Sequence, residues 1–186
     1  MTLRYAIRPA NPAAHLFHVV CRVERPDPGG QLFMLPAWVP GSYMIREFAR
    51  NIVRISALAG GRKIAIEKLD KHTWRAAPCR GPLEVACEIY AWDPSVRSAY
   101  LDRAQGFFNG TSVFLLPIGR EHEACSVDIL PPAGGAKWRV ITGLTPERGV
   151  RRLGFGTYQA HDYDELIDCT VQMGEFEHIR FDVRGV

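Results

Sequence analysis

Short runs in which apolar and polar residues alternate recur along this chain. In the run over residues 15–23, Phe17, Val19, Cys21 and Val23 share one face of an extended strand, because side chains alternate between faces with period two. Residues 83–92 alternate in the same way. Shorter runs of this type predict further strands over residues 31–35, 52–58, 63–69, 126–130, 138–142, 155–160 and 176–183.

Glycine and proline separate these runs and predict how they connect. The Asp-Pro-Gly-Gly sequence at 27–30 would join the runs on either side of it, 15–23 and 31–35, in a hairpin with a longer loop. The Gly-Gly pair at 60–61 would likewise join the two runs that flank it in a second, tighter hairpin. Antiparallel neighbours along the chain are therefore expected.

Helix signals are weak. They predict only single turns, after Ser42, after Asp93 or Ser95, and over residues 163–166. With many short strands and frequent turn residues, the expected fold is all-β: an antiparallel β-sandwich with a few short helical turns.

Composition narrows the class of protein. The chain has 186 residues, 47% of them hydrophobic and 23% charged, which suits one globular domain over residues 1–186. The formal charge is only +3, and the basic residues are scattered, so no nucleic-acid partner is expected. No apolar run reaches 18 residues and the N-terminal segment lacks an apolar signal region, so neither membrane insertion nor secretion is expected.

The five cysteines are odd in number, so they cannot all form disulfides with one another, and they include no C-x-x-C pair. This pattern favours reduced thiols in a cytoplasmic protein. Cys21, Cys87 and Cys125 lie in alternating runs, on the same face as aliphatic residues, which favours packing over catalysis. Cys169 is near His161, but the neighbouring carboxylates would raise its pKa, so a cysteine hydrolase is disfavoured.

Metal-site patterns are incomplete. His122-Glu123 begins like the zinc motif H-E-x-x-H, but Ser126 stands where the second histidine is required, so the motif fails. His15 and His18 would lie on opposite faces of a strand and could not share a metal ion. No metal site is expected in this chain.

The segment 35–51, LPAWVPGSYMIREFARN, is dense in aromatic and charged residues around the turn signal Pro40-Gly41. Trp38 and Tyr43 of this segment belong to a larger aromatic set that either anchors the core or forms a binding face, and core packing is the favoured interpretation. The set is Trp38, Tyr43, Trp74, Trp92, Phe107 and Phe108.

The segment 161–168, HDYDELID, places four carboxylates within seven residues. Like charges this close repel one another unless they are solvated, hydrogen-bonded or paired. Three interpretations stay open: a solvated loop, a docking site for a basic partner surface, or the wall of a pocket for a cationic group such as a peptide N-terminus.

Five segments, in this order, resemble the N-terminal region of the glycyl-aminopeptidase family of zinc metallopeptidases. They are residues 35–51, KHTW at 71–74, YAWDPSVRSAYLD at 90–102, FFNGTSVF at 107–114 and DYDELIDCTVQMG at 162–174. The resemblance implies a saddle-like, β-rich accessory domain, followed in the family by a catalytic domain that carries H-E-x-x-H and zinc. It implies two partners, that downstream catalytic domain and a short peptide substrate, with no cofactor held by this chain. The chain ends directly after a predicted strand, and we expect it to be part of a longer protein.

The resemblance also suggests which residues lie nearest the substrate. We expect these to be Tyr163, Asp164, Asp168, Gln172 and Gly174, with no catalytic residue among them. Where the family pattern reads Val-Glu-Met-Gly, this chain has Gln172, which keeps a hydrogen-bond acceptor and loses the charge. The alternative is a stand-alone β-sandwich module that binds a peptide or protein without catalysis.

Overall fold

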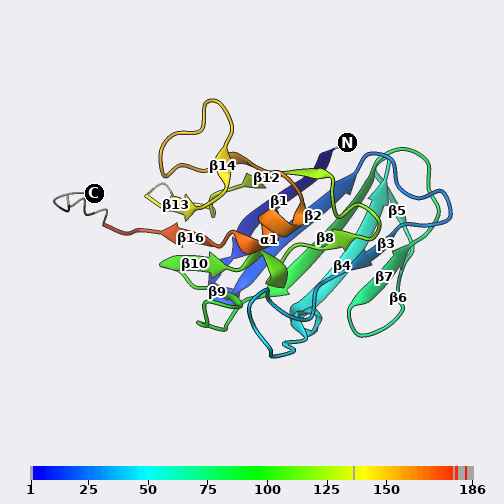
Figure 1. The fold of residues 1–186 in the computed structure, drawn as a ribbon, viewed down its shortest axis with the longest axis horizontal. Coiled ribbons are helices and arrows are strands. Elements are labelled where there is room, and N and C mark those ends of the chain that lie inside the picture. The colour runs from blue at the N-terminus through cyan, green and yellow to red at the C-terminus, as the bar shows by residue number, and fades with distance from the viewer. Residues whose placement is uncertain (1, 136, 178, 180–182, 184–186) are drawn as a thin grey trace.

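The computed structural model describes residues 2–135, 137–177, 179 and 183. Strands are the main secondary structure, and they form three sheets (Figure 1). Sheet A has eight strands, in the order β14 (Thr145–Pro146), β15 (Gly156–Ala160), β12 (Ala124–Ile129), β1 (Thr2–Asn11), β2 (Leu16–Val23), β8 (Leu83–Tyr90), β4 (Ile52–Ala59) and β5 (Arg62–Ile64). The prediction of an all-β fold is confirmed.

Two smaller sheets have four strands each. Sheet B has the order β11 (Leu116–Pro117), β3 (Leu32–Met34), β7 (Thr73–Ala76) and β6 (Ile66–Lys68). Sheet C has the order β13 (Arg139–Thr142), β16 (Val171–Gly174), β10 (Gln105–Phe108) and β9 (Ala99–Leu101). Neighbouring strands pair antiparallel throughout, except that β1 and β12 are parallel, from Thr2 opposite Ala124 to Ile7 opposite Ile129.

Helical structure is confined to short pieces. The one α-helix among the described residues is α1 (Tyr163–Asp168), and the 3-10 turns are η1 (Pro12–Ala14), η2 (Phe48–Asn51) and η3 (Gly110–Ser112). A turn at 163–166 was predicted and is confirmed as the start of α1. The turn predicted after Ser42 is wrong, since η2 begins only at Phe48. After Ser95 the chain makes one hydrogen-bonded turn, in which the Ser98 amide donates to the Ser95 carbonyl at 3.1 Å, and β9 follows it.

Alternation along the strands of sheet A produces the core. Phe17, Val19, Cys21 and Val23 of β2 are all buried, as predicted, and the residues between them are half-buried on the opposite face. Sheet C is joined to this buried face by edge-to-face aromatic contacts, such as that between Phe17 and Phe108 with ring centroids 5.7 Å apart. The core therefore lies between sheet A and the layer that contains sheets B and C and helix α1.

Two predicted connections need correction. Strand β3 does not form a hairpin with β2: it pairs with β7 and β11 in sheet B, so the 27–30 turn carries the chain from one sheet to another. The second hairpin is confirmed for β4 and β5, but its return strand breaks after Ile64 and β6 pairs with β7 in sheet B. The first connection therefore joins two sheets, and the second predicted return strand is divided between two sheets.

The strand predicted over 176–183 is not supported. The described residues Phe176, Glu177, Ile179 and Val183 are not in a strand, and the remaining positions of this run lie outside the described residues. The last strand among the described residues is β16, which begins three residues after the acidic segment 161–168 ends.

Candidate functional site

The Pro40-Gly41 turn forms as its residues require. The Ser42 amide donates to the Val39 carbonyl at 3.0 Å, and Gly41 has φ +77°, the left-handed conformation that the third residue of a type II turn needs. The turn holds a row of apolar side chains in solvent: Trp38 is 52% exposed, and Tyr43 is fully exposed. This part of segment 35–51 is surface, not core.

Two of the four carboxylates in segment 161–168 form hydrogen bonds at the N-terminal end of helix α1. Asp162 is its N-cap, with Oδ1 accepting from the Glu165 amide at 2.9 Å, and that hydrogen bond lowers the pKa of the Asp162 carboxyl. The Glu165 carboxylate accepts in turn from the His161 amide. Asp164 and Asp168 have no such role: their carboxylates form no hydrogen bond or ion pair with any described residue.

A cavity of about 760 Å³ separates the Pro40-Gly41 turn from α1, and we name it the Trp38 groove. Its apolar lining comes from the β3–β11 edge of sheet B, the turn and the helix. Its rim is acidic. The apolar lining residues are Met34, Pro36, Trp38, Pro40, Leu116, Tyr163 and Ile167, and the acidic ones are Glu121, Asp164, Glu165 and Asp168.

Tyr163 anchors the floor of the groove and offers no polar group to it. The side chain is 2% exposed, its hydroxyl donates to the Phe114 carbonyl at 2.7 Å, and its amide donates to the Glu121 carbonyl at 3.1 Å. Burial raises the pKa of the phenol well above its usual value. Tyr163 therefore holds α1 in place, whereas Asp164 and Asp168 are the exposed groups.

Gln172 lies on a different surface. On the outer side of sheet C it stands between Phe107 of β10 and Ile141 of β13, its partners on the neighbouring strands. Its amide Nε2 donates to Oε1 of Gln105 at 3.2 Å. A hollow of about 520 Å³ beside it is lined by the aromatic rings of Trp92, Tyr100 and Phe107, together with Pro94, Val96, Gln105 and Gln172; we name it the aromatic face.

Stacking orders the rings of the aromatic face. Trp92 stacks on Tyr100 with centroids 5.0 Å apart, and His15 lies against the Trp92 ring at 3.9 Å. The His15 ring is fixed by Nδ1, 2.6 Å from the Leu101 carbonyl, and the Tyr100 hydroxyl donates to Asp102 at 2.9 Å. A half-exposed, preorganised aromatic surface of this kind suits an apolar ligand or a protein partner.

Gly174 has a backbone role. Its φ is +150°, and a Cβ there would lie 2.8 Å from the Ala104 carbonyl oxygen. Only glycine allows β16 to pass this close to the β9–β10 turn. The five residues expected near a substrate thus divide into two groups: Tyr163, Asp164 and Asp168 at the Trp38 groove, and Gln172 and Gly174 at sheet C.

The sequence missed several partners of these residues. Met34, Leu116 and Glu121 reach the Trp38 groove only because sheet B and α1 meet there. The sequence also grouped six aromatic residues that the structure separates: Trp74 and Phe108 are core, whereas Trp38, Tyr43 and Trp92 are exposed. The alternation Gln105-x-Phe107 was the one local signal for the outer side of β10.

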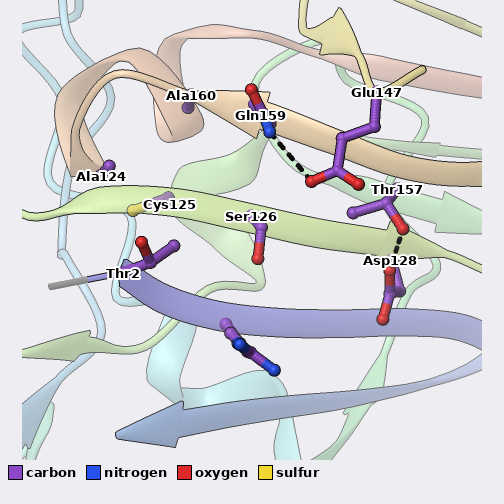
Figure 2. A pocket seen from close by; sticks show the side chains of 10 residues that line it. Thr2, Ala124, Cys125, Ser126, Asp128, Glu147, Thr157, Gln159 and Ala160 are labelled. Carbon is purple, nitrogen blue, oxygen red and sulfur yellow. Dashed lines mark hydrogen bonds between the residues drawn. The ribbon is translucent and has the colours of Figure 1, made fainter. Parts of the chain in front are cut away.

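A third hollow, of about 550 Å³, lies on the outer face of sheet A and is polar (Figure 2). Its side chains are engaged with one another across strands: the Thr157 hydroxyl donates to Asp128 at 2.6 Å, and the Gln159 amide donates to Glu147 at 2.9 Å. Cross-strand pairing accounts for these contacts. None of the residues expected near a substrate lines it.

Metal ligation finds no support in the described residues. No group of three or more His, Cys, Asp or Glu side chains among them could hold a metal ion. His122 lies in a loop rather than a helix, and the adjacent Glu123 pairs with Arg120 at 2.6 Å. Every helix in the part of the chain that the structure describes is too short or too polar to span a lipid bilayer.

All five cysteines are free thiols. Cys21, Cys87 and Cys125 are buried, as predicted, and burial raises the pKa of the Cys87 and Cys125 thiols to about 12. Cys169 is half-buried, and its pKa is raised by burial and then by Glu165 and Asp168. The exposed His161 ring faces Asp162 at 3.5 Å, so no thiol–imidazole pair is formed there.

We expect Cys169 to react with iodoacetamide more slowly than free cysteine at neutral pH, because a raised pKa lowers the fraction of thiolate. Mass spectrometry of the intact chain, with Cys169→Ser as the matched reference, would measure the rate at this position. Labelling of Cys169 faster than free cysteine would contradict the expected slow reaction and would support a role for this thiol as a nucleophile.

Comparisons of sequence and of structure show which known proteins this chain resembles. Residues 4–175 match the sequence profile of the peptidase M61 N-terminal domain. An aminopeptidase N family protein from Idiomarina loihiensis superposes with a TM-score of 0.93 and 35% sequence identity, over 99% of this chain and 31% of that chain. No curated protein matches this chain.

More distant structures share the fold alone. A variant of an M1 zinc metallopeptidase from Deinococcus radiodurans superposes with a TM-score of 0.55 and 8% identity, over 94% of this chain and 41% of that chain. The same values hold for that variant bound to a Tyr-Ser-Ala substrate. This chain therefore spans well under half the length of the solved relatives it matches.

Proposed function

Because the chain belongs to the peptidase M61 N-terminal domain family, we propose that it is the non-catalytic accessory domain of a zinc metallo-aminopeptidase. Residues 1–186 form that single domain. It covers one side of the active-site cleft and helps to bind short peptides, and it acts in the cytoplasm.

One observation carries the proposal. The family profile spans residues 4–175, almost the whole chain, yet the 35%-identical relative is about three times longer, with this chain matching 31% of it. In such a protein the zinc and the zinc-activated water that hydrolyses the N-terminal peptide bond belong to the downstream catalytic domain. This chain's own contribution is then to bind and orient the peptide.

The two surfaces described above are the parts of this domain suited to a cleft. In this proposal Asp164, Asp168 and Gln172 present side chains to the peptide, and Tyr163 and Gly174 hold the elements that carry them. The five segments that resemble the family supply most of both surfaces: Trp38 lies in one, Trp92 and Tyr100 in another, Phe107 in a third.

In the full-length enzyme, we expect Gln172→Glu to lower KM for free-amine peptides by about three- to tenfold with little change in kcat. A carboxylate there would attract the substrate ammonium in the ground state and the transition state alike, which changes binding rather than chemistry. Asp164→Ala should raise KM by a similar factor. Steady-state kinetics with a free-amine tripeptide measures both effects.

Gln159→Glu and Asp128→Ala are the matched controls, since both positions lie on the outer face of sheet A and should leave KM unchanged. If neither Gln172→Glu nor Asp164→Ala alters KM or kcat, these residues do not contact the substrate. If the unsubstituted full-length protein hydrolysed no peptide, that result would instead favour a binding module without catalysis.

A further inference from the structure

We propose that the Trp38 groove binds the side chain of an arginine or lysine residue in a peptide. This inference rests on the proposed function for the source of the peptide, and it names the class of residue that the groove would select. It does not depend on where the peptide bond is cut.

The shape and lining of the groove suit a long side chain with an apolar stem. At about 760 Å³ it lies within the usual range for ligand pockets, about 300–1,000 Å³. Leu116, Tyr163 and Ile167 form a buried apolar floor, and Trp38 stands half-exposed at one wall. The methylene groups of Lys or Arg pack on such surfaces while the charged head stays near water.

Among the residues that the structure describes, the charged side chains lining the groove are all acidic. Four carboxylates line it, and no described lysine, arginine or histidine does, although the chain as a whole has a net charge of +3. Two of the four, Asp164 and Asp168, are four residues apart and so lie on the same face of α1. Like charges at that spacing repel, and neither carboxylate is compensated by any described residue.

A long cationic side chain complements both the apolar floor and the acidic rim of the groove. Its charge pairs with Asp164 and Asp168, and a guanidinium or ammonium group over an indole gains further from the ring. A purely apolar ligand would cover carboxylates without pairing them, which is unfavourable, and an anion would be repelled. A free N-terminal ammonium has the charge but lacks the apolar stem that the floor accommodates.

The test measures peptide binding to the 186-residue chain by ¹H–¹⁵N NMR, with the Trp38 indole signal identified from Trp38→Phe. The probe is N-acetyl-Ala-Arg-Ala-amide. Its citrulline counterpart is the neutral isostere, and free-amine Ala-Leu-Ala carries only an N-terminal charge. We expect the arginine peptide to shift the Trp38 indole and the α1 amides, and the citrulline peptide to bind about three- to tenfold more weakly.

Substitutions locate the site. The double substitution Asp164→Asn and Asp168→Asn should lower the affinity for the arginine peptide about three- to tenfold. Trp38→Leu should lower that affinity to a similar extent. Glu67→Gln, which neutralises an exposed carboxylate on β6, is the control and should leave affinity unchanged. Added salt should weaken binding of the arginine peptide to the unsubstituted chain.

Several results would overturn the proposal: equal binding of the citrulline peptide, shifts confined to the aromatic face, tighter binding of free-amine Ala-Leu-Ala, or no binding of the arginine peptide at its solubility limit. The proposed function is tested separately by zinc-dependent hydrolysis in the full-length protein. A protein that hydrolyses peptides without preferring arginine over citrulline would retain the accessory-domain function and lose the groove assignment.

Discussion

Phe108→Ala should destabilise the chain by about 3–5 kcal/mol, because it removes a large ring from the junction between two sheets. Phe108 is 0% exposed and makes edge-to-face contacts with Phe17 of β2 and Phe114, each with ring centroids 5.7 Å apart. Phe114 in turn contacts Tyr5 of β1 at 5.2 Å. Loss of the central ring leaves a cavity that two β-sheets cannot close without moving apart.

The adjacent residue is the matched control. Phe107 lies on the same strand with its side chain on the opposite, outer side of sheet C, so Phe107→Ala removes the same ring from a half-exposed position. We expect a cost below about 1 kcal/mol there. Urea or thermal unfolding of both variants measures the difference. Equal losses would show that the two faces of β10 contribute equally to the core, contrary to this packing.

Gly110→Ala should cost about 1–3 kcal/mol and loosen helix α1. A Cβ on Gly110 would lie 2.7 Å from both the Ile167 Cα and the Leu166 carbonyl oxygen, which are backbone atoms of the helix. Backbone cannot yield as a flexible side chain can, so η3 and α1 must separate. Because α1 forms one wall of the Trp38 groove, Gly110→Ala should also lower the affinity of that groove for a ligand.

Gly29→Ala provides the comparison, since its Cβ would meet only the Asp27 carboxylate, at 3.2 Å. Replacing glycine by alanine also restricts the unfolded chain, which stabilises by about 0.4–1 kcal/mol, so Gly29→Ala should be close to neutral. Hydrogen exchange of the α1 amides would separate local loosening from global unfolding. Unchanged α1 protection in Gly110→Ala would contradict close packing between η3 and α1.

These two packing contacts bear directly on function. The aromatic contacts of Phe108 join sheet C to sheet A. Gly110, which follows Phe108 by two residues, allows α1 to lie close to η3. The Trp38 groove and the aromatic face are therefore held by neighbouring parts of one segment, 107–114. Stability measurements on this segment should accompany every binding or kinetic measurement, because a loosened fold would disturb both surfaces together.

Local features were predictable from residue type and spacing. Alternation marked β2 and β8 and their buried faces, and Pro40-Gly41 specified its turn. Each of these depends on sterics and hydrogen bonds within a few residues. The family resemblance, which rests on five ordered segments, was confirmed by the profile over residues 4–175.

Pairing between distant strands was not predictable in this way. Nothing near Thr2 in the sequence indicates that β1 pairs in parallel with β12, more than 100 residues later, or that β3 leaves its neighbour for sheet B. Such pairings are selected by how much apolar surface the whole chain can bury, and no window of the sequence contains that quantity.

The same limit applies to the candidate site. The sequence alone determined that residues 161–168 carry an excess of acid and that Trp38 and Phe107 lie among family-like residues. Only the tertiary structure decided that Asp162 and Glu165 cap a helix, that Asp164 and Asp168 face an apolar groove beside Trp38, and that Gln172 belongs to a separate aromatic face. The physical reason is that a side chain's chemistry is local, whereas its exposure and its neighbours are set by how the sheets and α1 pack together.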